Sequence, residues 1–92
     1  MTLQINHRPE AGRIEANVEN NLCYIEYRLD STVMHVLHTI VPAAVGGRGI
    51  AGKLTDYALD LARENGWKIN PVCSYTAAYF KRHPEHRDLS AA

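Results

Sequence analysis

The sequence predicts a small α/β (α+β) domain with a mixed, mostly antiparallel sheet and two main helices. Three observations predict this class. Segments of alternating polar and apolar residues, joined by short turns, fill the first half of the chain, and such segments pair as antiparallel strands. A glycine-rich stretch then leads into a segment with apolar residues at helical spacing. A further strand and a second helix follow, and a strand–helix–strand unit requires parallel pairing.

Length and composition predict one domain over residues 1–92 and argue against several classes of protein. The chain is 46% hydrophobic and 22% charged, as globular domains are. Ten Lys and Arg balance ten Asp and Glu, which argues against a protein that coats nucleic acid or an anionic membrane. The sequence shows neither a signal peptide nor an apolar run of roughly 20 residues. Cys23 and Cys73 are too few for a disulfide framework, so we expect a reduced, cytoplasmic protein.

The first half of the chain contains several strand signals. Residues 2–6 can form a short edge strand, and the Pro and Gly of residues 8–12 mark a loop. Apolar and polar side chains alternate in residues 13–19 and again in residues 22–29, as in half-buried strands. Turn chemistry at residues 19–21 joins these two strands. The buried faces are predicted to carry Ile14, Ala16 and Val18, then Cys23, Ile25, Tyr27 and Leu29.

The next strand, residues 33–41, follows a turn at residues 30–32 and has two apolar faces. One face is predicted to hold Val33, Leu37 and Val41, and the other Met34, Val36 and Ile40. Two apolar faces favour a central strand that is covered on both sides. Pro42 ends it.

A helix and a short strand follow the glycine-rich stretch. Apolar residues recur at helical spacing, namely Ile50, Leu54, Tyr57, Ala58, Leu61 and Ala62. Asn65-Gly66 is a C-cap signal. Residues 67–72 are predicted to form a strand parallel to residues 33–41, because a helical crossover joins the two.

The last part of the chain predicts a second helix. Ser74 is expected to cap this helix over residues 75–82. Pro84 can open a final turn through residue 89, and we expect the tail at residues 90–92 to fray.

The segment most suggestive of chemistry is Gly46-Gly47-Arg48-Gly49-Ile50-Ala51-Gly52. Its glycines leave backbone N–H groups uncovered, and the helix that begins near Gly49 adds its unpaired N–H groups and the positive end of its dipole. Such an arrangement binds phosphate or pyrophosphate, and Arg48 supplies a cation. The spacing fits neither a P-loop nor a dinucleotide-binding loop. The alternative is a flexible connection without a ligand.

These residues resemble motif A of the GNAT superfamily of acyl-CoA-dependent N-acetyltransferases, which reads Gln/Arg-x-x-Gly-x-Gly/Ala. Gly49 and Ala51 match its fourth and sixth positions, whereas Gly46 stands where Gln or Arg is expected. The wider resemblance, over about residues 14–89, is to very small single-motif GNAT-like proteins. It is carried by residues 38–42, the glycine segment, residues 71–73, Tyr79 and residues 83–85.

The resemblance implies a curved sheet that is splayed between its fourth and fifth strands, with CoA in the splay. It places the pyrophosphate on the backbone of residues 46–52, and Ile40 and Val41 would offer backbone groups to the pantetheine arm, as an added strand does. Cations at the end of the second helix, Arg82 and His83 with Lys81, are candidates for the adenosine end of CoA. The alternative is that they form a solvated helix terminus.

Cys73 is the candidate catalytic residue. It lies at a strand end just before a helix, where unpaired N–H groups stabilise a thiolate. In the family that the chain resembles, a cysteine at this place lies near the acyl-CoA thioester. Three alternatives remain open: a nucleophile that forms an acyl-cysteine, a thiol that lines the site, and a small buried hydrophobe. Cys23, on an alternating strand, is predicted to be core.

Direct acyl transfer to the amine requires a base and an acid instead. Glu26, His35 and His38 are possible bases, and Tyr75 and Tyr79 are possible acids.

The spacing of the histidines gives only a weak indication of a metal site. In a strand, His35-x-x-His38 points its two rings to opposite faces. His83-x-x-His86 is interrupted by Pro84. We therefore expect no metal.

The sequence thus predicts a protein that uses acetyl-CoA or CoA as acyl donor substrate and transfers an acetyl group to an amine of a small molecule or a protein. The alternatives are a non-catalytic CoA-binding interaction module and a structural domain whose glycine segment binds nothing.

Overall fold

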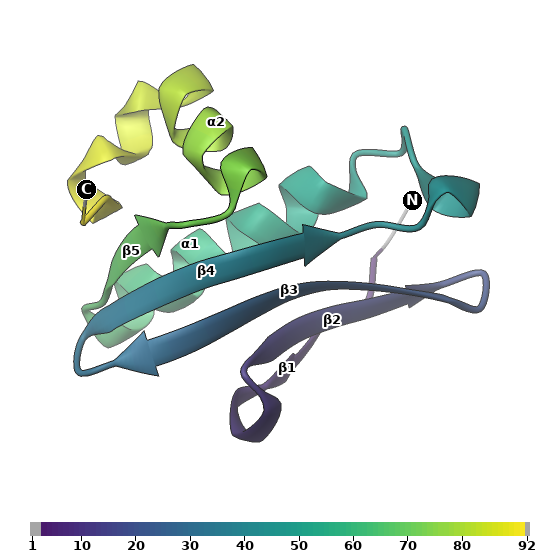
Figure 1. Ribbon diagram of the computed structural model, residues 1–92, viewed down its shortest axis with the longest axis horizontal. Helices are drawn as coiled ribbons and strands as arrows, with labels where there is room; N and C mark the ends of the chain where they lie inside the picture. Colours follow the sequence, from purple (N-terminus) through teal and green to yellow (C-terminus); the bar gives the residue numbers. More distant parts are fainter. Residues whose placement is uncertain (1–2, 92) are drawn as a thin grey trace.

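The computed structural model describes residues 3–91, in which a five-stranded sheet carries a long helix across one face (Figure 1). The strands lie in chain order, the first four antiparallel and the last pair parallel. This confirms the predicted α+β class with its mixed, mostly antiparallel sheet. The strands are β1 (Asn6–Arg8), β2 (Arg13–Val18), β3 (Asn21–Asp30), β4 (Val33–Ile40) and β5 (Lys68–Pro71); the helices are α1 (Ile50–Asn65), α2 (Ser74–Arg82) and the short 3-10 helices η1 (Pro9–Ala11), η2 (Ala43–Val45) and η3 (Pro84–Leu89).

The edge strand β1 begins later than predicted, because it starts at Asn6, the last residue of the predicted range 2–6, and runs to Arg8; Thr2 of that range lies outside the described residues. The connection to β2 explains the difference. Pro9 ends β1 and opens η1, and Gly12 closes this turn with a φ of +64°. So tight a connection pairs the residues directly before Pro9 with the start of β2, and Asn6 lies opposite Glu15.

The hairpin between β2 and β3 forms as predicted. Glu19 and Asn20 both have positive φ angles, 51° and 65°, which are those of the two-residue turn that matches the twist of paired strands. The predicted inner faces of both strands are buried, except that Leu29, near the end of β3, is 41% exposed.

A β-bulge in β4 overturns part of the predicted pattern. Tyr27 pairs with Val36, but Glu26 pairs with His38, so Leu37 is the extra residue. Met34 and Val36 are buried on the same face as Tyr27, whereas beyond the bulge Ile40 pairs with Tyr24 on the other face and is 42% exposed. The bulge cannot be read from the alternation of the sequence, because the extra residue changes the face on which every later side chain of the strand lies. The prediction that both faces of β4 are covered is also wrong, because Val33 and Leu37, assigned to the second face, are only half-buried.

Helix α1 packs against β2, β3, β4 and β5 and completes the core. Its buried positions are Ile50, Leu54, Thr55, Ala58, Leu59 and Ala62. Leu59 therefore lies in the core, where the sequence had predicted Tyr57 and Leu61, which are only half-buried. The predicted C-cap is confirmed: Gly66 has a φ of +70°, and its N–H donates to the carbonyls of Ala62 and Arg63.

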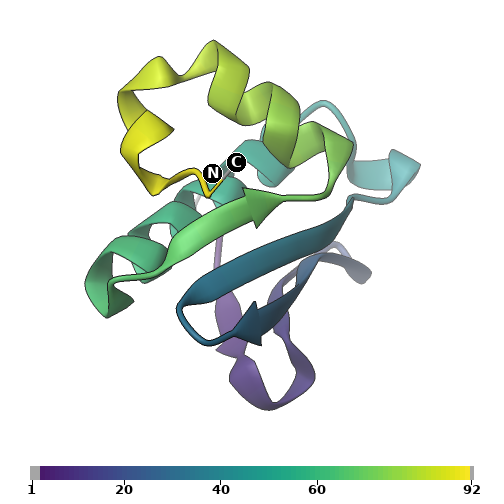
Figure 2. The ribbon, with the colours of Figure 1, turned by 60° about the vertical axis from the view of Figure 1, so that its left-hand side comes forward.

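Helix α2 leaves the end of β5 and lies beside α1 (Figure 2), to which the Tyr79 hydroxyl donates a hydrogen bond at Asp56. Its N-cap is Cys73, and Ser74, the predicted cap, is instead the first helical residue. The predicted fraying of the tail is wrong for its described residues. Ser90 bridges to Ile69 on the outer edge of β5, and the Ala91 N–H donates to the Ile69 carbonyl.

Within residues 3–91, no helix has the length and apolar character needed to cross a bilayer.

Candidate functional site

The candidate site lies where β4 and β5 stop pairing. The parallel ladder joins Val33–Val36 to residues 68–71 and then ends. The chain after β5 turns into α2, and the Cys73 N–H donates to the Val36 carbonyl at 2.8 Å. Residues 37–40, here called the open end of β4, therefore run beyond the tip of β5 (Figure 1). On that edge they have no strand partner within residues 3–91.

The glycine segment follows the open end of β4 and begins α1. Gly47 and Gly49 have φ angles of +76° and +75°, and a Cβ built on either meets no atom within 4 Å. Both are exposed, and Gly49 is the N-cap of α1. Their conformation is one that L side chains rarely adopt, and the space in front of them is open. Such a turn can hold an oxyanion against backbone.

The remaining residues of the glycine segment differ in whether their backbone N–H groups are available to bind a ligand. Ile50, Ala51 and Gly52 are the first three residues of α1, and their N–H groups have no acceptor within the helix. The side chain of Ile50 itself is buried in the core, with 2% exposed. The N–H of Gly46 is already used, because it donates to the Ala43 carbonyl at 3.1 Å. Gly46 can therefore shape the turn, but its N–H is not a free donor.

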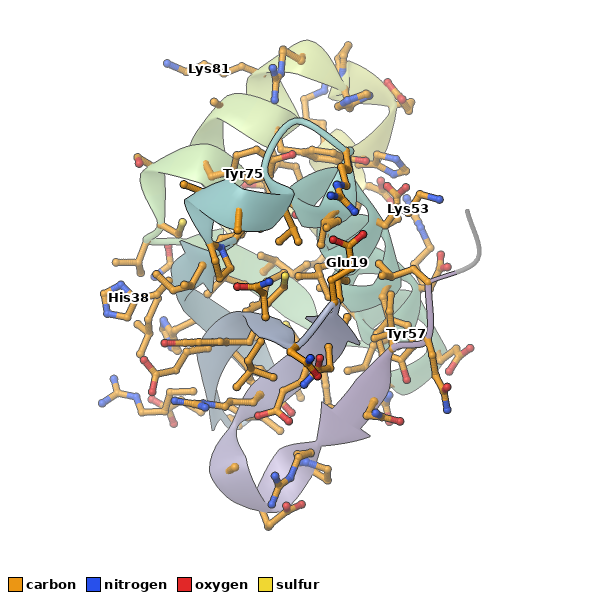
Figure 3. The ribbon with its side chains drawn as sticks, turned by 90° about the vertical axis from the view of Figure 1, so that its right-hand side faces the viewer. Glu19, His38, Lys53, Tyr57, Tyr75 and Lys81 are labelled. Carbon is orange, nitrogen blue, oxygen red and sulfur yellow. The ribbon has the colours of Figure 1, made fainter. Side chains whose placement is uncertain are left out.

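Arg48 is paired with a carboxylate of another element. Its Nη1 lies 2.5 Å from Oε2 of Glu19 and its Nη2 lies 3.3 Å from Oε1, so the guanidinium holds the carboxylate in two places. Arg48 thereby lowers the pKa of the Glu19 carboxyl, through hydrogen bonding first and charge second. Figure 3 shows Glu19 beside the start of α1. Sequence reasoning missed this partner, which lies in the β2–β3 turn.

Ile40 is the last residue of the open end of β4, and Val41 follows it toward the glycine segment. Ile40 is 42% exposed, and Val41 is half-buried against the core.

Cys73 combines an N-cap position with several hydrogen-bond donors. Its half-exposed thiol lies 3.4 Å from the Thr39 hydroxyl on the open end of β4. Burial raises the pKa of the Cys73 thiol, but hydrogen bonds from the Thr39 hydroxyl and from the backbone N–H groups of Thr76 and Tyr75 outweigh it and bring the pKa below its usual value. Cys23 differs, since it is buried and its pKa is raised by burial alone.

The sequence did not single out Thr39 and Thr76, which lie beside this thiol. Thr76 is 2% exposed, and its Oγ1 is the buried side-chain polar atom without a partner in residues 3–91. One sequence signal for Thr76 existed. It stands three residues after Cys73, the spacing at which an N-cap and a first-turn side chain meet.

The two tyrosines of α2 are in different states. Tyr79 is buried and donates its proton to Asp56, and burial followed by the Asp56 contact strongly raises the pKa of Tyr79. Its hydroxyl is thus engaged in holding α2 to α1. The Tyr75 hydroxyl lies 3.6 Å from the position of a Cβ built on Gly52, at the start of α1. Tyr75 is therefore the tyrosine that lies beside the glycine segment.

Arg82 and His83 diverge at the end of α2. The Arg82 guanidinium lies 6.0 Å from the centre of the Tyr75 ring. The ring of His83 lies 4.2 Å from that of Tyr79, and its Nδ1 is 3.3 Å from Glu85.

The candidate bases lie on the face of the sheet opposite α1. His35 pairs with Arg28 and His38 pairs with Glu26, so the bulge puts both rings on one face, contrary to the prediction. Asn70 lies 3.0 Å from Nδ1 of His35, and Glu26 lies 4.0 Å from Nε2 of His38. Figure 3 shows His38 projecting on the opposite side from Tyr57 of α1. No group of three or more His, Cys, Asp or Glu in residues 3–91 is arranged to hold a metal ion.

Comparison with known proteins gives concordant matches. Residues 13–89 match the family described as GCN5-related N-acetyl-transferase. Protein NATD1 of Gallus gallus is 33% identical over 88 residues, which span 89% of this chain and 77% of the relative. Protein NATD1 of Homo sapiens is 40% identical over 52 residues, 56% of this chain and 46% of that protein. The solution structure of a GCN5-like protein from Staphylococcus aureus has a TM-score of 0.78 at 26% identity, over 97% of this chain and 88% of that one.

Proposed function

This chain belongs to the GCN5-related N-acetyltransferase family, and from that premise we propose that it binds acetyl-CoA at the open end of β4 and transfers the acetyl group to an amine. The observation that carries the proposal is the exposed turn of Gly47 and Gly49 at the N-cap of the 16-residue helix α1. It follows, after η2, the open end of β4, whose outer edge has no strand partner within residues 3–91. A strand edge and a phosphate-binding turn together suit a ligand that has a peptide-like arm and a pyrophosphate.

The residues present fit such a donor substrate. The pyrophosphate would sit on the N–H groups of Gly47, Gly49 and the first turn of α1, where the helix dipole favours an anion. The peptide-like pantetheine arm would bond the backbone near Ile40 and Val41, as an added strand does. Arg82, beside Tyr75, would meet the phosphate-rich end. For His83, which already contacts Glu85, we propose a minor role at that end.

We propose that Cys73 takes the acetyl group first. Its thiolate would attack the thioester carbonyl, forming an acetyl-cysteine and releasing CoA as a thiolate. The amine would then attack the acetyl-cysteine carbonyl; the C–N bond forms, the C–S bond breaks, the Cys73 thiolate leaves, and the nitrogen gives up a proton to solvent. The lowered pKa of the Cys73 thiol, set by its hydrogen bonds against the opposing effect of burial, supports this role. The Tyr75 hydroxyl would protonate the leaving thiolate, because Tyr79 is bound to Asp56.

Titration calorimetry with CoA tests the binding step. Gly49→Asp places a Cβ and a negative charge where the pyrophosphate would touch backbone, and we expect it to weaken CoA binding by at least about 100-fold. Gly66→Asp is the matched control, because Gly66 has the same positive φ and the same open space at the far end of α1. It should bind CoA within about twofold of the wild type. Equal CoA affinity in a folded Gly49→Asp variant would contradict the site.

Turnover of acetyl-CoA with a panel of amines tests the chemistry. If acetyl-cysteine forms, Cys73→Ala lowers turnover by several orders of magnitude, and mass spectrometry traps the acetyl group on Cys73 in the wild type. A loss of about tenfold or less, with no trapped intermediate, would show direct transfer to the amine. CoA binding without turnover of any amine would indicate the non-catalytic binding module instead.

A further inference from the structure

The side chain of Thr76 has a buried hydroxyl without a hydrogen-bond partner among residues 3–91. With 2% of the residue exposed, water does not reach it freely. Buried polar groups are nearly always bonded, so such an exception indicates a ligand or a functional role. In α2, Thr76 is the third residue after the N-cap Cys73, and this spacing brings its side chain back to the N-cap. The Thr76 hydroxyl, which has no hydrogen-bond partner among residues 3–91, therefore lies on the side of the Cys73 sulfur.

Cys73 is only partly buried, and its sulfur is surrounded by donors. The sulfur lies 3.4 Å from the Thr39 hydroxyl and stands at the start of α2, where N–H groups have no partner within the helix. Burial raises the pKa of Cys73, but hydrogen bonds from the Thr39 hydroxyl and from the backbone N–H groups of Tyr75 and Thr76 outweigh it, so the pKa is lowered. A larger fraction of this thiol is therefore thiolate at neutral pH, and the thiolate is the form that peroxides oxidise.

We propose that Cys73 is a peroxide-reactive modification site, at which oxidation places an oxygen atom within reach of the unpartnered Thr76 hydroxyl. The thiolate attacks one oxygen of a hydroperoxide; the S–O bond forms and the O–O bond breaks. The leaving oxygen departs with the bond electrons and takes up a proton, giving water or an alcohol. The sulfur loses two electrons and becomes a sulfenic acid. The new oxygen is an acceptor, which is what the Thr76 hydroxyl lacks.

Oxidation would also switch off acetyl transfer by the covalent route, because the same sulfur would no longer be a nucleophile. This consequence, unlike the oxidation itself, rests on the proposed function. A thiol converts the sulfenic acid to a disulfide, and a second thiol reduces that disulfide back to the free cysteine, so the modification is reversible.

The test uses the full, reduced chain and hydrogen peroxide in the absence of any CoA. Dimedone traps the sulfenic acid, and mass spectrometry locates it and gives its rate of formation. We expect Cys73 to react at least about tenfold faster than N-acetylcysteine at pH 7, because a lowered pKa supplies more thiolate. Cys23, which is buried and has a raised pKa, is the internal control and should stay unlabelled.

Matched variants test the part played by the hydroxyl. Thr76→Ser keeps the hydroxyl, whereas Thr76→Ala and the isosteric Thr76→Val remove it. We expect Thr76→Ser to react within about twofold of the wild type, and the two others roughly tenfold more slowly. Circular dichroism verifies folding. If Thr76→Val does not fold, Thr76→Ala against Thr76→Ser gives the same comparison.

Two results would overturn the inference: oxidation of wild-type Cys73 no faster than that of N-acetylcysteine, or an unchanged rate in a folded variant without the Thr76 hydroxyl. Because the assay contains no CoA, it is separate from the test of acetyl transfer. A chain that oxidises as expected but turns over no acetyl-CoA would keep this inference and lose the proposed function. A chain that transfers acetyl groups but has an unreactive Cys73 would do the reverse.

Discussion

Single side chains of this molecule are shared between the fold and the proposed ligand site, and Arg48 illustrates the conflict. Its guanidinium already contacts both carboxylate oxygens of Glu19. A phosphate group would likewise offer the guanidinium two oxygens that can accept its paired N–H groups. Both groups are exposed to solvent, so their ion pair is weak and readily exchanged. Glu19 therefore acts as an internal competitor for any anion that binds at the glycine segment.

This competition predicts opposite effects for the two partners. Arg48→Ala should weaken CoA binding by about tenfold at low salt, and the loss should shrink at high salt because the charges are screened. Glu19→Gln should strengthen CoA binding about threefold, because it frees the guanidinium. Titration calorimetry at two salt concentrations measures both changes. Weaker binding in Glu19→Gln would mean that the pair positions Arg48 rather than competing for it.

How much of the site could be predicted depends on whether a partner is local in sequence. The glycine segment and Cys73 were identifiable because their chemistry lies in consecutive residues. Glu19 and Thr39 were not, because Glu19 lies 29 residues from Arg48 and Thr39 lies 34 residues from Cys73, and only the folded sheet brings them together. Thr76 was within reach of sequence reasoning, but the sequence favours Ser74 as the helix cap, and this conceals the spacing from Thr76 to the true N-cap, Cys73.

At the scale of elements, the strands and helices follow from their patterns, and the departures occur where one residue changes the geometry. The strand order and the parallel last pair were predictable because turn residues and a helical crossover leave few alternatives. The bulge at Leu37 was not, since its cause lies in the pairing of β4 with β3. Because of that single residue, His35 and His38 lie on the same face of the sheet, whereas Val36 and Ile40 lie on opposite faces. A strand pattern alone could therefore not have placed the candidate bases.

The connection between β1 and β2 depends on one glycine. Gly12 has a φ of +64°, and a Cβ there would overlap the carbonyl oxygen of Tyr27, while its own carbonyl accepts from the Tyr27 N–H at 2.8 Å. Gly12→Ala should lower the free energy of unfolding by about 3 kcal/mol, through backbone strain and this clash. Gly66→Ala, with a similar φ but open space around it, should cost only about 1 kcal/mol. Urea denaturation measures both, and equal losses would show that the clash is relieved without cost.

The whole molecule balances its charges, and this sets its response to acid. The pKa values of the exposed carboxyls of Glu10, Glu19, Glu85 and Asp88 are lowered, by hydrogen bonds to their own backbone or to basic side chains. Burial lowers the pKa of His7 below 6.5, against an opposing effect of Glu10. For each of these groups the folded state binds the proton less tightly than the unfolded chain does, so each contributes stability that acid removes.

We therefore expect the free energy of unfolding to fall in two stages as the pH decreases. The first stage begins near pH 6.5, the ordinary value for histidine, as protonation of His7 becomes favourable in the unfolded chain. The second begins near pH 4.5, the ordinary value for Glu, and continues as the pH falls through the lowered carboxyl values. Urea midpoints from pH 8 to pH 3 measure both. His7→Gln should remove the first stage and leave the second, and a stage that persists in this variant would have another origin.

The strand order, which equals the chain order, also has a kinetic consequence. The β2–β3 and β3–β4 ladders close across tight turns, so the meander is a set of local contacts that form quickly. The last ladder is different, because it joins Val33 to Lys68 only after α1 has crossed over between them. Until then the outer edge of β4 is unpaired along its whole length, and an unpaired edge invites pairing with another chain. We expect refolding yield to fall with protein concentration, and substitutions that slow the docking of β5, such as Ile69→Ala in its buried centre, to lower that yield further.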